Sequence, residues 1–476
     1  MVDLFYDSCG STNHAFFFTA AGLCKDAATY SSRIDAKMEK TDSPTMKKGR
    51  YILGAGVTGL AAGVSSGLPI LEAVDQPGGI CSSYYMRIGD SARKTSPPNN
   101  GQAYRFELGG GHWIFGASPA MLKFIQKFSP VKTYRRRSAV YFPDKKIYVP
   151  YPLQDHLSCL DHKIRKAALS ELAHASPLGR TMKEWLRASF GPTLYNLFFA
   201  PFHTAYTAGL YDRIAPQDSY KSPANRVQVQ RGARGQAAKA GYNVTFVYPQ
   251  KGLDALTQRM AAACKIHYGH RVEKIDLSRK KIVCQNGATF FYEKLISTLP
   301  LNQVISLCGL KTKSLPDPYT SVLVLNIGGE RGKDCPRDHW IYVPKSKSGF
   351  HRVGIYSNVD VSFLPKAHRN NHAAASFYVE RAFSGGMKPA AGQIKKYADL
   401  VLQELQDWGY IRKCHVLDPT WIEVAYTWTW PDSQWRTEAM RLLESHQIYP
   451  VGRYARWVFQ GIADSMCDGL AGADVF

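Results

Sequence analysis

The sequence predicts an α/β fold that combines a parallel sheet with a second, mostly antiparallel one. Three observations support this. A short apolar strand at residues 51–53 runs into spaced glycines and a small-residue helix at 60–66. Residues 121–200 contain three segments with the 3.6-residue period of helices. Residues 311–444 contain short apolar runs with the spacing of antiparallel strands, broken by a helix over 393–408.

The glycines Gly54, Gly56 and Gly59 form a GxGxxG turn between the first strand and the first helix. In a Rossmann-type unit the first glycine permits the tight turn, the second lets the backbone approach a pyrophosphate, and the third lets the helix pack on the strand. Glu72 follows a second short strand at 69–71, where a carboxylate holds an adenosine ribose.

A bare glycine motif is weak evidence, because glycine-rich turns also serve as simple chain reversals. Here strand, glycines, helix, second strand and acid occur in the required order. Gly78 and Gly79 follow the acid and let the chain pass close to a second part of the same ligand. The sequence therefore predicts a dinucleotide site.

The glycine run at 109–111 follows an apolar strand and precedes His112 and an aromatic cluster. Three consecutive glycines cost backbone entropy, so Gly110 and Gly111 predict close approach of a flat or charged ligand. A basic segment at 227–241 admits two interpretations, a mobile linker or a phosphate-gripping lid, and we favour the linker.

The charge balance is basic, with 60 Lys and Arg against 38 Asp and Glu, a net charge of +22. Such an excess attracts polyanions. No nucleic-acid-binding motif accompanies it, so a solvated basic surface is favoured over nucleic-acid binding, and an anionic substrate or cofactor stays open.

The ten cysteines are scattered without metal-ligand spacing, so we expect free thiols, no metal site and a cytoplasmic location. No apolar run approaches the roughly 18 to 20 residues of a membrane span. The longest near the start, at 15–24, lacks a basic flank, which argues against a signal peptide.

The predicted domains are discontinuous. Residues 1–45 are expected to form a disordered extension, residues 121–242 a helical insertion, and residues 311–444 an antiparallel-sheet substrate domain. The remaining segments, 46–120, 243–310 and 445–476, are expected to form the nucleotide-binding domain. The sequence gives no indication of oligomeric state.

Five ordered segments carry a resemblance to a known family. They are GGGHWIFG (109–116), FFAPFHTAYT (198–207), NVTFVYPQKGL (243–253), HWIYVPKSKSGFHRVGIYSN (339–358) and VGRYARWVFQ (451–460). From residue 46 onward the chain resembles the FAD-dependent superfamily of flavin amine oxidases and protoporphyrinogen oxidases, and within it the UDP-galactopyranose mutase-like branch. The resemblance implies a Rossmann-type FAD-binding domain and FAD as cofactor.

The resemblance also implies roles for particular residues. His112 would lie beside the flavin ring, to position it or to transfer a proton; the alternative is a packed, hydrogen-bonded histidine. Arg352 would grip an anionic substrate group, a role that suits the guanidinium fork; the alternative is a solvent-facing strand arginine. Gly452, Arg453 and Tyr454 would form the C-terminal flavin-binding segment, and the alternative for Arg453 is a salt bridge in the core.

Two positions depart from the mutase pattern. Phe459 stands where the mutases place a tyrosine hydroxyl, and Ala200 stands where they place a second diphosphate-binding arginine. Each lost hydrogen bond is worth about 1 to 3 kcal/mol. A sugar-nucleotide substrate would then need compensating residues, for which Arg213 and Arg226 are candidates.

These features predict an FAD-dependent oxidoreductase that acts on a small, anionic metabolite. The alternative is a mutase-like isomerase that uses reduced FAD on a phosphate-bearing nucleotide-sugar substrate. A basic nucleic-acid-binding protein that retains only the fold is a remote third hypothesis. The aromatic stripe at 421–430 could line a substrate site, although such stripes usually belong to a core.

Overall fold

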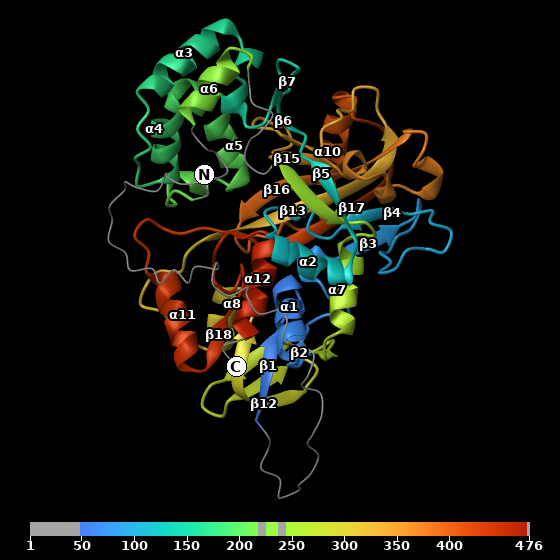
Figure 1. Cartoon of the computed structure of the whole chain (residues 1–476), viewed down its shortest axis with the longest axis vertical. Helices are drawn as coiled ribbons and strands as arrows, with labels where there is room; N and C mark the ends of the chain where they lie inside the picture. The colour runs from blue at the N-terminus through green and yellow to red at the C-terminus, as the bar shows by residue number, and fades with distance from the viewer. Residues whose placement is uncertain (1–47, 218–224, 237–243, 474–476) are drawn as a thin grey trace, which may run out of the picture. The chain divides into compact units, whose positions relative to one another are not determined.

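Strand β1 (Gly49–Leu53) lies inside a parallel sheet and leads directly into helix α1 (Val57–Ser66) (Figure 1). The computed structural model describes residues 48–217, 225–236 and 244–473, and the extension expected over 1–45 lies outside them. Ile52 and Leu53 are fully buried, which is typical of a strand covered on both faces. Gly67 ends α1 in the left-handed conformation, with φ of 69°.

The parallel sheet is assembled from three separated parts of the sequence. β1 pairs in parallel with β2 and β12, β2 with β9, and β12 with β18. An antiparallel extension, β10 and β11, continues from β12. These strands are β2 (Ile70–Leu71), β9 (Ile266–His267), β10 (Val272–Asp276), β11 (Lys281–Cys284), β12 (Thr289–Ser297) and β18 (Ile448–Pro450).

Helices cover this sheet. α12 (Ile462–Gly472) packs against α1 so closely that a Cβ on Gly469 would lie 2.2 Å from the Thr58 carbonyl oxygen. α7 (Leu253–Ala262) contacts α1 as well. The cluster around β12 and β18 includes buried side chains of α8 (Leu301–Leu307) and α11 (Trp435–Ser445).

A second sheet of seven strands has the order β17-β13-β16-β15-β14-β6-β7. All of its pairs are antiparallel except β14 with β6. The α/β fold class with one parallel and one mostly antiparallel sheet is therefore confirmed. The strands are β6 (Ser138–Phe142), β7 (Ile147–Pro150), β13 (Tyr319–Arg331), β14 (Trp340–Tyr342), β15 (Arg352–Ile355), β16 (Ala374–Ser384) and β17 (Ile411–Thr427).

Helix α10 (Ala391–Asp407) packs on the second sheet through Tyr397, Val401 and Leu405, which recur at helical spacing and are buried. The short α9 (Tyr356–Val359) follows β15. Two small strand pairs complete the described sheets. They are β3 (Ser83–Met86) with β4 (Tyr104–Glu107), and β5 (Val131–Arg135) with β8 (Thr245–Pro249).

The helical segments expected between 121 and 200 are present, but residues 131–150 between them form β5, β6 and β7. The alternating pattern there is short and includes exposed positions, so the sequence analysis missed it. The helices are α2 (Pro119–Phe128), α3 (His162–Ala173), α4 (Met182–Leu194) and α5 (Ala200–Tyr206).

The linker predicted over 227–241 is wrong for its first half, which forms helix α6 (Arg226–Ala233). Asn225 caps the helix by accepting a hydrogen bond from the Gln228 backbone N–H. Val229 and Ala233 are buried against the neighbouring helices, so tertiary packing stabilises a segment with weak helical propensity. Residues 237–241 lie outside the described part.

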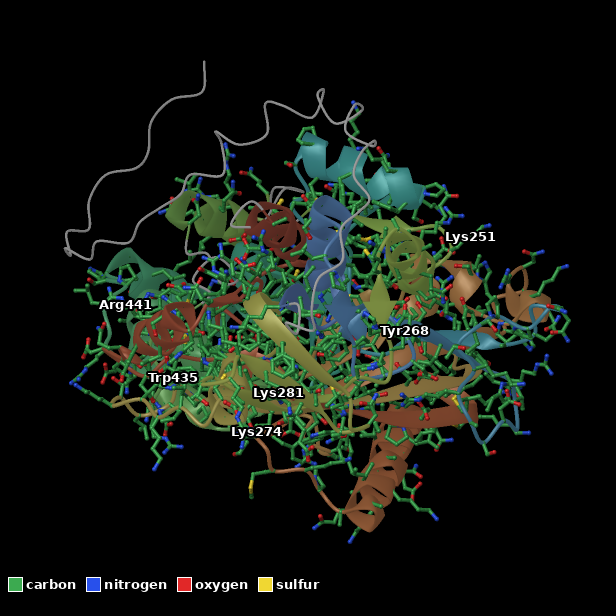
Figure 2. All side chains as sticks on the ribbon, turned by 90° about the horizontal axis from the view of Figure 1, so that it is seen from below. Lys251, Tyr268, Lys274, Lys281, Trp435 and Arg441 are labelled. Carbon is green, nitrogen blue, oxygen red and sulfur yellow. The ribbon has the colours of Figure 1, made fainter. Side chains whose placement is uncertain are left out.

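Exposed basic side chains occur on separate elements. Figure 2 labels three of them: Lys251 in the loop after β8, Lys274 in β10, and Arg441 in α11. Within the described ranges, no helix is both long enough and apolar enough to cross a bilayer.

Candidate functional site

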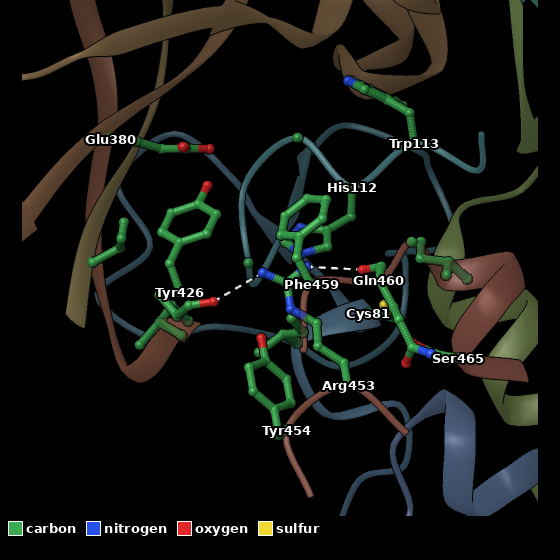
Figure 3. Close-up of a pocket in the computed structure, with 18 of the residues that line it drawn as sticks. Cys81, His112, Trp113, Glu380, Tyr426, Arg453, Tyr454, Phe459, Gln460 and Ser465 are labelled. Carbon is green, nitrogen blue, oxygen red and sulfur yellow. Dashed lines mark hydrogen bonds between the residues drawn. The ribbon is translucent and has the colours of Figure 1, made fainter. Parts of the chain in front are cut away.

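A cavity of about 800 Å³ extends from the glycine turn to the second sheet. Its nucleotide end is lined mostly by backbone, and its far chamber mostly by aromatic side chains; Figure 3 shows part of the lining. Every predicted site residue lines it except Gly59, Gly110 and Gly452. The predicted residues on the wall are Gly54, Gly56, Glu72, Gly78, Gly79, Gly111, His112, Arg352, Arg453 and Tyr454.

The three glycines of the turn meet different constraints. Gly54 has φ of 95°, and a Cβ there would lie 2.7 Å from Thr298 Oγ1. A Cβ on Gly59 would lie 1.9 Å from the Gly54 carbonyl oxygen, so only glycine allows α1 to pack there. A Cβ on Gly56 would meet no atom within 4 Å, because it would project into open space. Gly56 thus faces a cradle at the N-terminus of α1, where anions are stabilised.

Glu72 lies beside this turn and is 9% exposed. Its Oε2 accepts a hydrogen bond from the Ala55 N–H at 2.7 Å, and its Oε1 accepts one from the Val74 N–H at 3.1 Å. A carboxylate has about four acceptor sites. Two bonds to backbone therefore fix its orientation and leave acceptor capacity for a hydroxyl pair in the cavity.

The second glycine pair is bonded to the first turn. The Gly78 N–H donates to the Ala55 carbonyl oxygen at 2.8 Å. Both Gly78 and Gly79 have positive φ, 104° and 56°. This segment therefore closes one side of the cradle in a conformation that favours glycine.

The glycine run at 109–111 passes under the second sheet. A Cβ on Gly110 would lie 2.9 Å from Glu380 Oε1, and one on Gly111 would lie 2.1 Å from the Tyr378 hydroxyl. His112 follows, on the cavity wall, and burial lowers its pKa from the ordinary value to about 4. At neutral pH its imidazole is uncharged.

The C-terminal segment brings Arg453 to the junction of the two ends of the cavity. Its guanidinium donates to the carbonyl oxygens of Gln460 and Ala425, both at 3.0 Å, and lies 4.5 Å from the centre of the Phe459 ring (Figure 3). Both of these bonds go to neutral carbonyl oxygens. Arg453 Nε and Gln460 Oε1 are buried with no hydrogen-bond partner among the described residues. Two buried polar atoms beside a cavity are the signature expected of a missing polar ligand.

Arg352 lies in the cavity wall with its side chain 21% exposed, and it forms an ion pair with Glu380. Arg352 Nε donates to Oε2 at 2.9 Å, and Nη2 lies 2.6 Å from Oε1. The Glu380 side chain is 2% exposed. This two-point contact holds the pKa of the Glu380 carboxyl below its usual range despite burial, which raises it. An anionic ligand at Arg352 would share the guanidinium with Glu380.

Glu380 and His351 are site residues that the sequence patterns did not predict. Glu380 is a buried acid in the mostly apolar strand β16, and a charged residue within such a strand could have indicated a site. His351, 1% exposed, precedes Arg352, and its Nε2 lies 3.5 Å from Glu380 Oε2. Of the aromatic stripe at 421–430, Tyr426 and Trp428 line the cavity.

The two residues that depart from the mutase pattern, Phe459 and Ala200, differ in their distance from the cavity. Phe459 lines the cavity under Arg453, whereas Ala200 begins α5 and is absent from the cavity wall. Arg213 is exposed and lies 3.7 Å from Asp212, away from the wall. Arg226 begins α6, and its side chain lies outside the described part of the structure.

The described cysteines are all free. In the same part of the chain, no group of three or more His, Cys, Asp or Glu side chains is arranged to hold a metal ion.

The fold is similar to those of several solved flavoprotein-related structures. The crystal structure of reduced UDP-galactopyranose mutase matches with a TM-score of 0.75 and 22% sequence identity, over 90% of this chain and 95% of that one. A putative protoporphyrinogen oxidase from Exiguobacterium sp. 255-15 matches with a TM-score of 0.65 and 12% identity, over 90% and 98%. Putrescine oxidase bound to putrescine matches with a TM-score of 0.53 and 14% identity, over 90% and 98%. At these identities the likeness establishes the fold.

The residues at the nucleotide end fit FAD. The open space over Gly56 admits a pyrophosphate at the α1 N-terminus, and Glu72 retains acceptor capacity for a ribose. The buried Arg453 Nε and Gln460 Oε1 have no hydrogen-bond partner among the described residues. The family model for flavin containing amine oxidoreductases matches residues 62–333, more than half of the chain. The chain therefore belongs to the flavin containing amine oxidoreductase family and is an FAD-dependent enzyme.

Proposed function

We propose that this protein is an FAD-dependent oxidoreductase that takes a hydride from a C–N or C–C bond of a small metabolite bearing an anionic group, and passes the electrons onward. The observation that carries this proposal is the continuity of the cavity. One space joins the backbone-lined nucleotide end to a chamber whose wall contains Glu380, Arg352 and aromatic rings. When bound, FAD supplies the redox chemistry, while the protein supplies orientation and electrostatics.

The chamber has the properties of a substrate site for a small organic molecule. Its wall is formed by aromatic side chains that offer apolar area and exclude water, and they surround few polar groups. These aromatic residues are Trp113, Phe115, Trp185, Phe202, Tyr206, Trp340, Tyr342, Tyr426, Trp428 and Phe459.

The charge on the wall supports an anionic ligand. The Glu380 carboxylate is neutralised by Arg352, whereas Arg453 donates to carbonyl oxygens, so its positive charge is not balanced by those contacts. An anion beside Arg453 is stabilised in a site from which water is excluded. Either the cofactor phosphates or an anionic group of the substrate would be the anion that Arg453 stabilises.

In this proposal the remaining residues keep their predicted roles. Gly54, Gly56, Gly59, Gly78 and Gly79 shape the cofactor cradle. Glu72 holds the ribose. Gly110, Gly111, Gly452, Arg453 and Tyr454 enclose the flavin end of the cofactor, and His112 positions it or transfers a proton. The free cysteines favour a reducing, cytoplasmic location.

A second candidate is a UDP-galactopyranose mutase-like isomerase that uses reduced FAD. The likeness of the fold to the reduced mutase, with a TM-score of 0.75, favours it. Three features of the chamber argue against it. Phe459 has no hydroxyl, position 200 carries alanine away from the wall, and Arg352 is already paired with Glu380.

The experiment uses purified protein under anaerobic conditions. We expect a yellow flavoprotein whose oxidised flavin band bleaches with at least one member of a panel of amines, amino acids and cyclic imines. A colourless protein that also binds no added FAD would contradict both enzyme proposals. Interconversion of UDP-galactopyranose and its furanose isomer by dithionite-reduced protein, with no bleaching by the panel, would favour the mutase and overturn the oxidoreductase.

A further inference from the structure

His351 is a buried histidine on the wall of the aromatic chamber, immediately before β15. Its backbone is fixed on both sides, because its N–H donates to the Glu380 carbonyl oxygen at 3.0 Å and its carbonyl oxygen accepts from the Val343 N–H at 2.9 Å. The ring lies 5.3 Å from the Tyr206 ring and 6.1 Å from the Phe202 ring, both from α5. The imidazole is therefore held between the second sheet and the helical segment.

The imidazole is poorly satisfied for a group that is 1% exposed. Nε2 faces Glu380 Oε2 at 3.5 Å, and neither Nε2 nor Nδ1 forms a hydrogen bond in the part of the chain that the structure describes. A carboxylate accepts hydrogen bonds, so the facing nitrogen carries the proton and Nδ1 keeps a lone pair. A buried acceptor without a partner is destabilising. This cost is recovered if a ligand in the chamber supplies a donor.

Glu380 links this histidine to the segment predicted to lie beside the flavin. A methyl group placed on Gly110 would come within 2.9 Å of Glu380 Oε1, while Oε2 faces His351. In Figure 3 the Glu380 carboxylate points toward the space around His112 and Tyr426. One carboxylate oxygen therefore lies near the glycine run and the other faces the imidazole, while both are bonded to Arg352.

We propose that His351 is a catalytic residue whose Nδ1 accepts the proton of a substrate N–H, and that Glu380 is its positioning residue. This inference rests on the proposed oxidoreductase function. His351 Nδ1 would take the proton of the substrate N–H bond, whose electron pair would form the C=N bond, while FAD, when bound, would accept the hydride released from the adjacent C–H bond. The imidazolium that forms would face the Glu380 carboxylate, which it would share with the Arg352 guanidinium.

The charged and titratable groups around His351 set its protonation. Glu380 on β16 favours the imidazolium, whereas burial and the adjacent Arg352 guanidinium disfavour it, so the pKa of His351 is lowered from its ordinary value. Tyr206 on α5, whose ring lies 5.3 Å from the His351 ring, and Tyr342 on β14, whose ring packs on Phe202, line the same cavity. At neutral pH His351 is uncharged and able to accept a proton.

An equilibrium test on the FAD-loaded protein uses indole and N-methylindole as probes. Both are flat, neutral and apolar, and only indole has an N–H to donate. We expect indole to bind wild-type protein about tenfold more tightly than N-methylindole, measured by calorimetry, because it supplies the hydrogen bond that Nδ1 lacks. The preference should disappear in His351→Phe. It should persist in His339→Phe, a matched change at a buried histidine of the second sheet that is not on the cavity wall.

The pH dependence separates a proton acceptor from a packing residue. In wild type the preference for indole should persist below the ordinary histidine pKa of about 6.5 and be lost only as pH falls through the lowered pKa of His351, because protonation converts Nδ1 from acceptor to donor. Glu380→Gln should move this loss to lower pH, because the carboxylate that favours the imidazolium is removed. Equal binding of the two probes by wild type, or the same preference in wild type and His351→Phe, would overturn the proposal, and so would failure of both probes to bind.

Turnover adds a second readout. With a substrate that bleaches the flavin, we expect kcat/KM to fall on the acid side in wild type, and His351→Gln to lower kcat at least tenfold and abolish that acid limb. An intact acid limb in His351→Gln would exclude His351 as the base. If no substrate bleaches the flavin while the indole preference depends on His351, the oxidoreductase function fails and the N–H contact stands.

Discussion

The two ends of the cavity are built from different parts of the polypeptide. The nucleotide end is shaped by backbone, through the turns at Gly54, Gly56 and Gly78 and the N-terminus of α1. The far chamber is shaped by side chains, of which Arg352 and Glu380 are paired and the rest are mainly aromatic. The backbone end suits the FAD cofactor of the family, whereas our proposal assigns the choice of substrate to the side-chain end.

The largest effect should come from filling the cradle. Gly56→Val puts a side chain into space that is open in this structure, and Gly56 has φ of −68°, which any residue adopts. We expect a folded protein with nearly complete loss of bound flavin, measured by absorbance after gel filtration. Gly392→Val is the control, because a Cβ there also meets no atom within 4 Å but lies at the start of α10. Full flavin content in Gly56→Val would place the cofactor elsewhere.

The next effect concerns the buried pair in the chamber. Arg352→Leu leaves Glu380, 2% exposed, without its partner, so the free energy of unfolding should fall by about 3 to 5 kcal/mol. Arg180→Leu removes an ion pair of similar length whose side chains are 73% and 77% exposed, and should cost less than about 1 kcal/mol. Chemical denaturation of both variants measures the difference.

The double variant Arg352→Leu/Glu380→Leu sharpens this prediction. It should recover most of the lost stability, because no unpaired charge stays buried. It should also fail to bind an anionic ligand that wild type binds. If Arg352→Leu binds that ligand with unchanged affinity, the substrate role predicted for Arg352 is wrong.

A smaller effect is expected at the junction of the two ends. Burial lowers the pKa of His112 to about 4 in the folded protein, whereas the same imidazole in the unfolded chain binds a proton near pH 6.5. Stability from the neutral imidazole is therefore present above pH 6.5 and is lost as pH falls toward 4. His112→Gln should flatten that decline by about 1 to 2 kcal/mol, measured by denaturation at several pH values. An unchanged slope would mean that His112 titrates normally.

The smallest effect distinguishes the two candidate functions. Phe459→Tyr adds the hydroxyl that the mutase pattern requires at a position on the cavity wall. One new hydrogen bond could raise the affinity of the reduced protein for UDP by up to about tenfold. We expect less than a twofold change, because Arg352 is engaged by Glu380. A tenfold gain in a UDP titration would favour the mutase.

The difference between the two ends also explains what the sequence could predict. The α/β fold and the roles of Gly54, Gly56 and Glu72 depend on local spacing, because a turn, a helix start and the following strand lie within one short stretch. The Arg352–Glu380 pair depends on the register of β15 with β16, which local patterns do not determine. The helix at 226–233 likewise forms through packing against neighbours.

His351 shows the same limit at the level of one side chain. It lies in the segment 339–358 that carries the family resemblance, directly before the arginine that the resemblance implies to be functional. The structure places Glu380 beside its imidazole and gives neither ring nitrogen a hydrogen bond to the described residues. Polar satisfaction is a property of the folded environment, so no sequence pattern reports it.

The place of β18 in the parallel sheet has a consequence for biosynthesis. β18 pairs with β12, and a Cβ on Gly452 would lie 2.5 Å from Thr58 Oγ1 of α1, so residues after 447 complete the wall begun by β1. A nascent chain folds from its N-terminus while the ribosome still holds later residues. The glycine turn is therefore made early, but the wall beside it is completed only when residues 448–472 emerge.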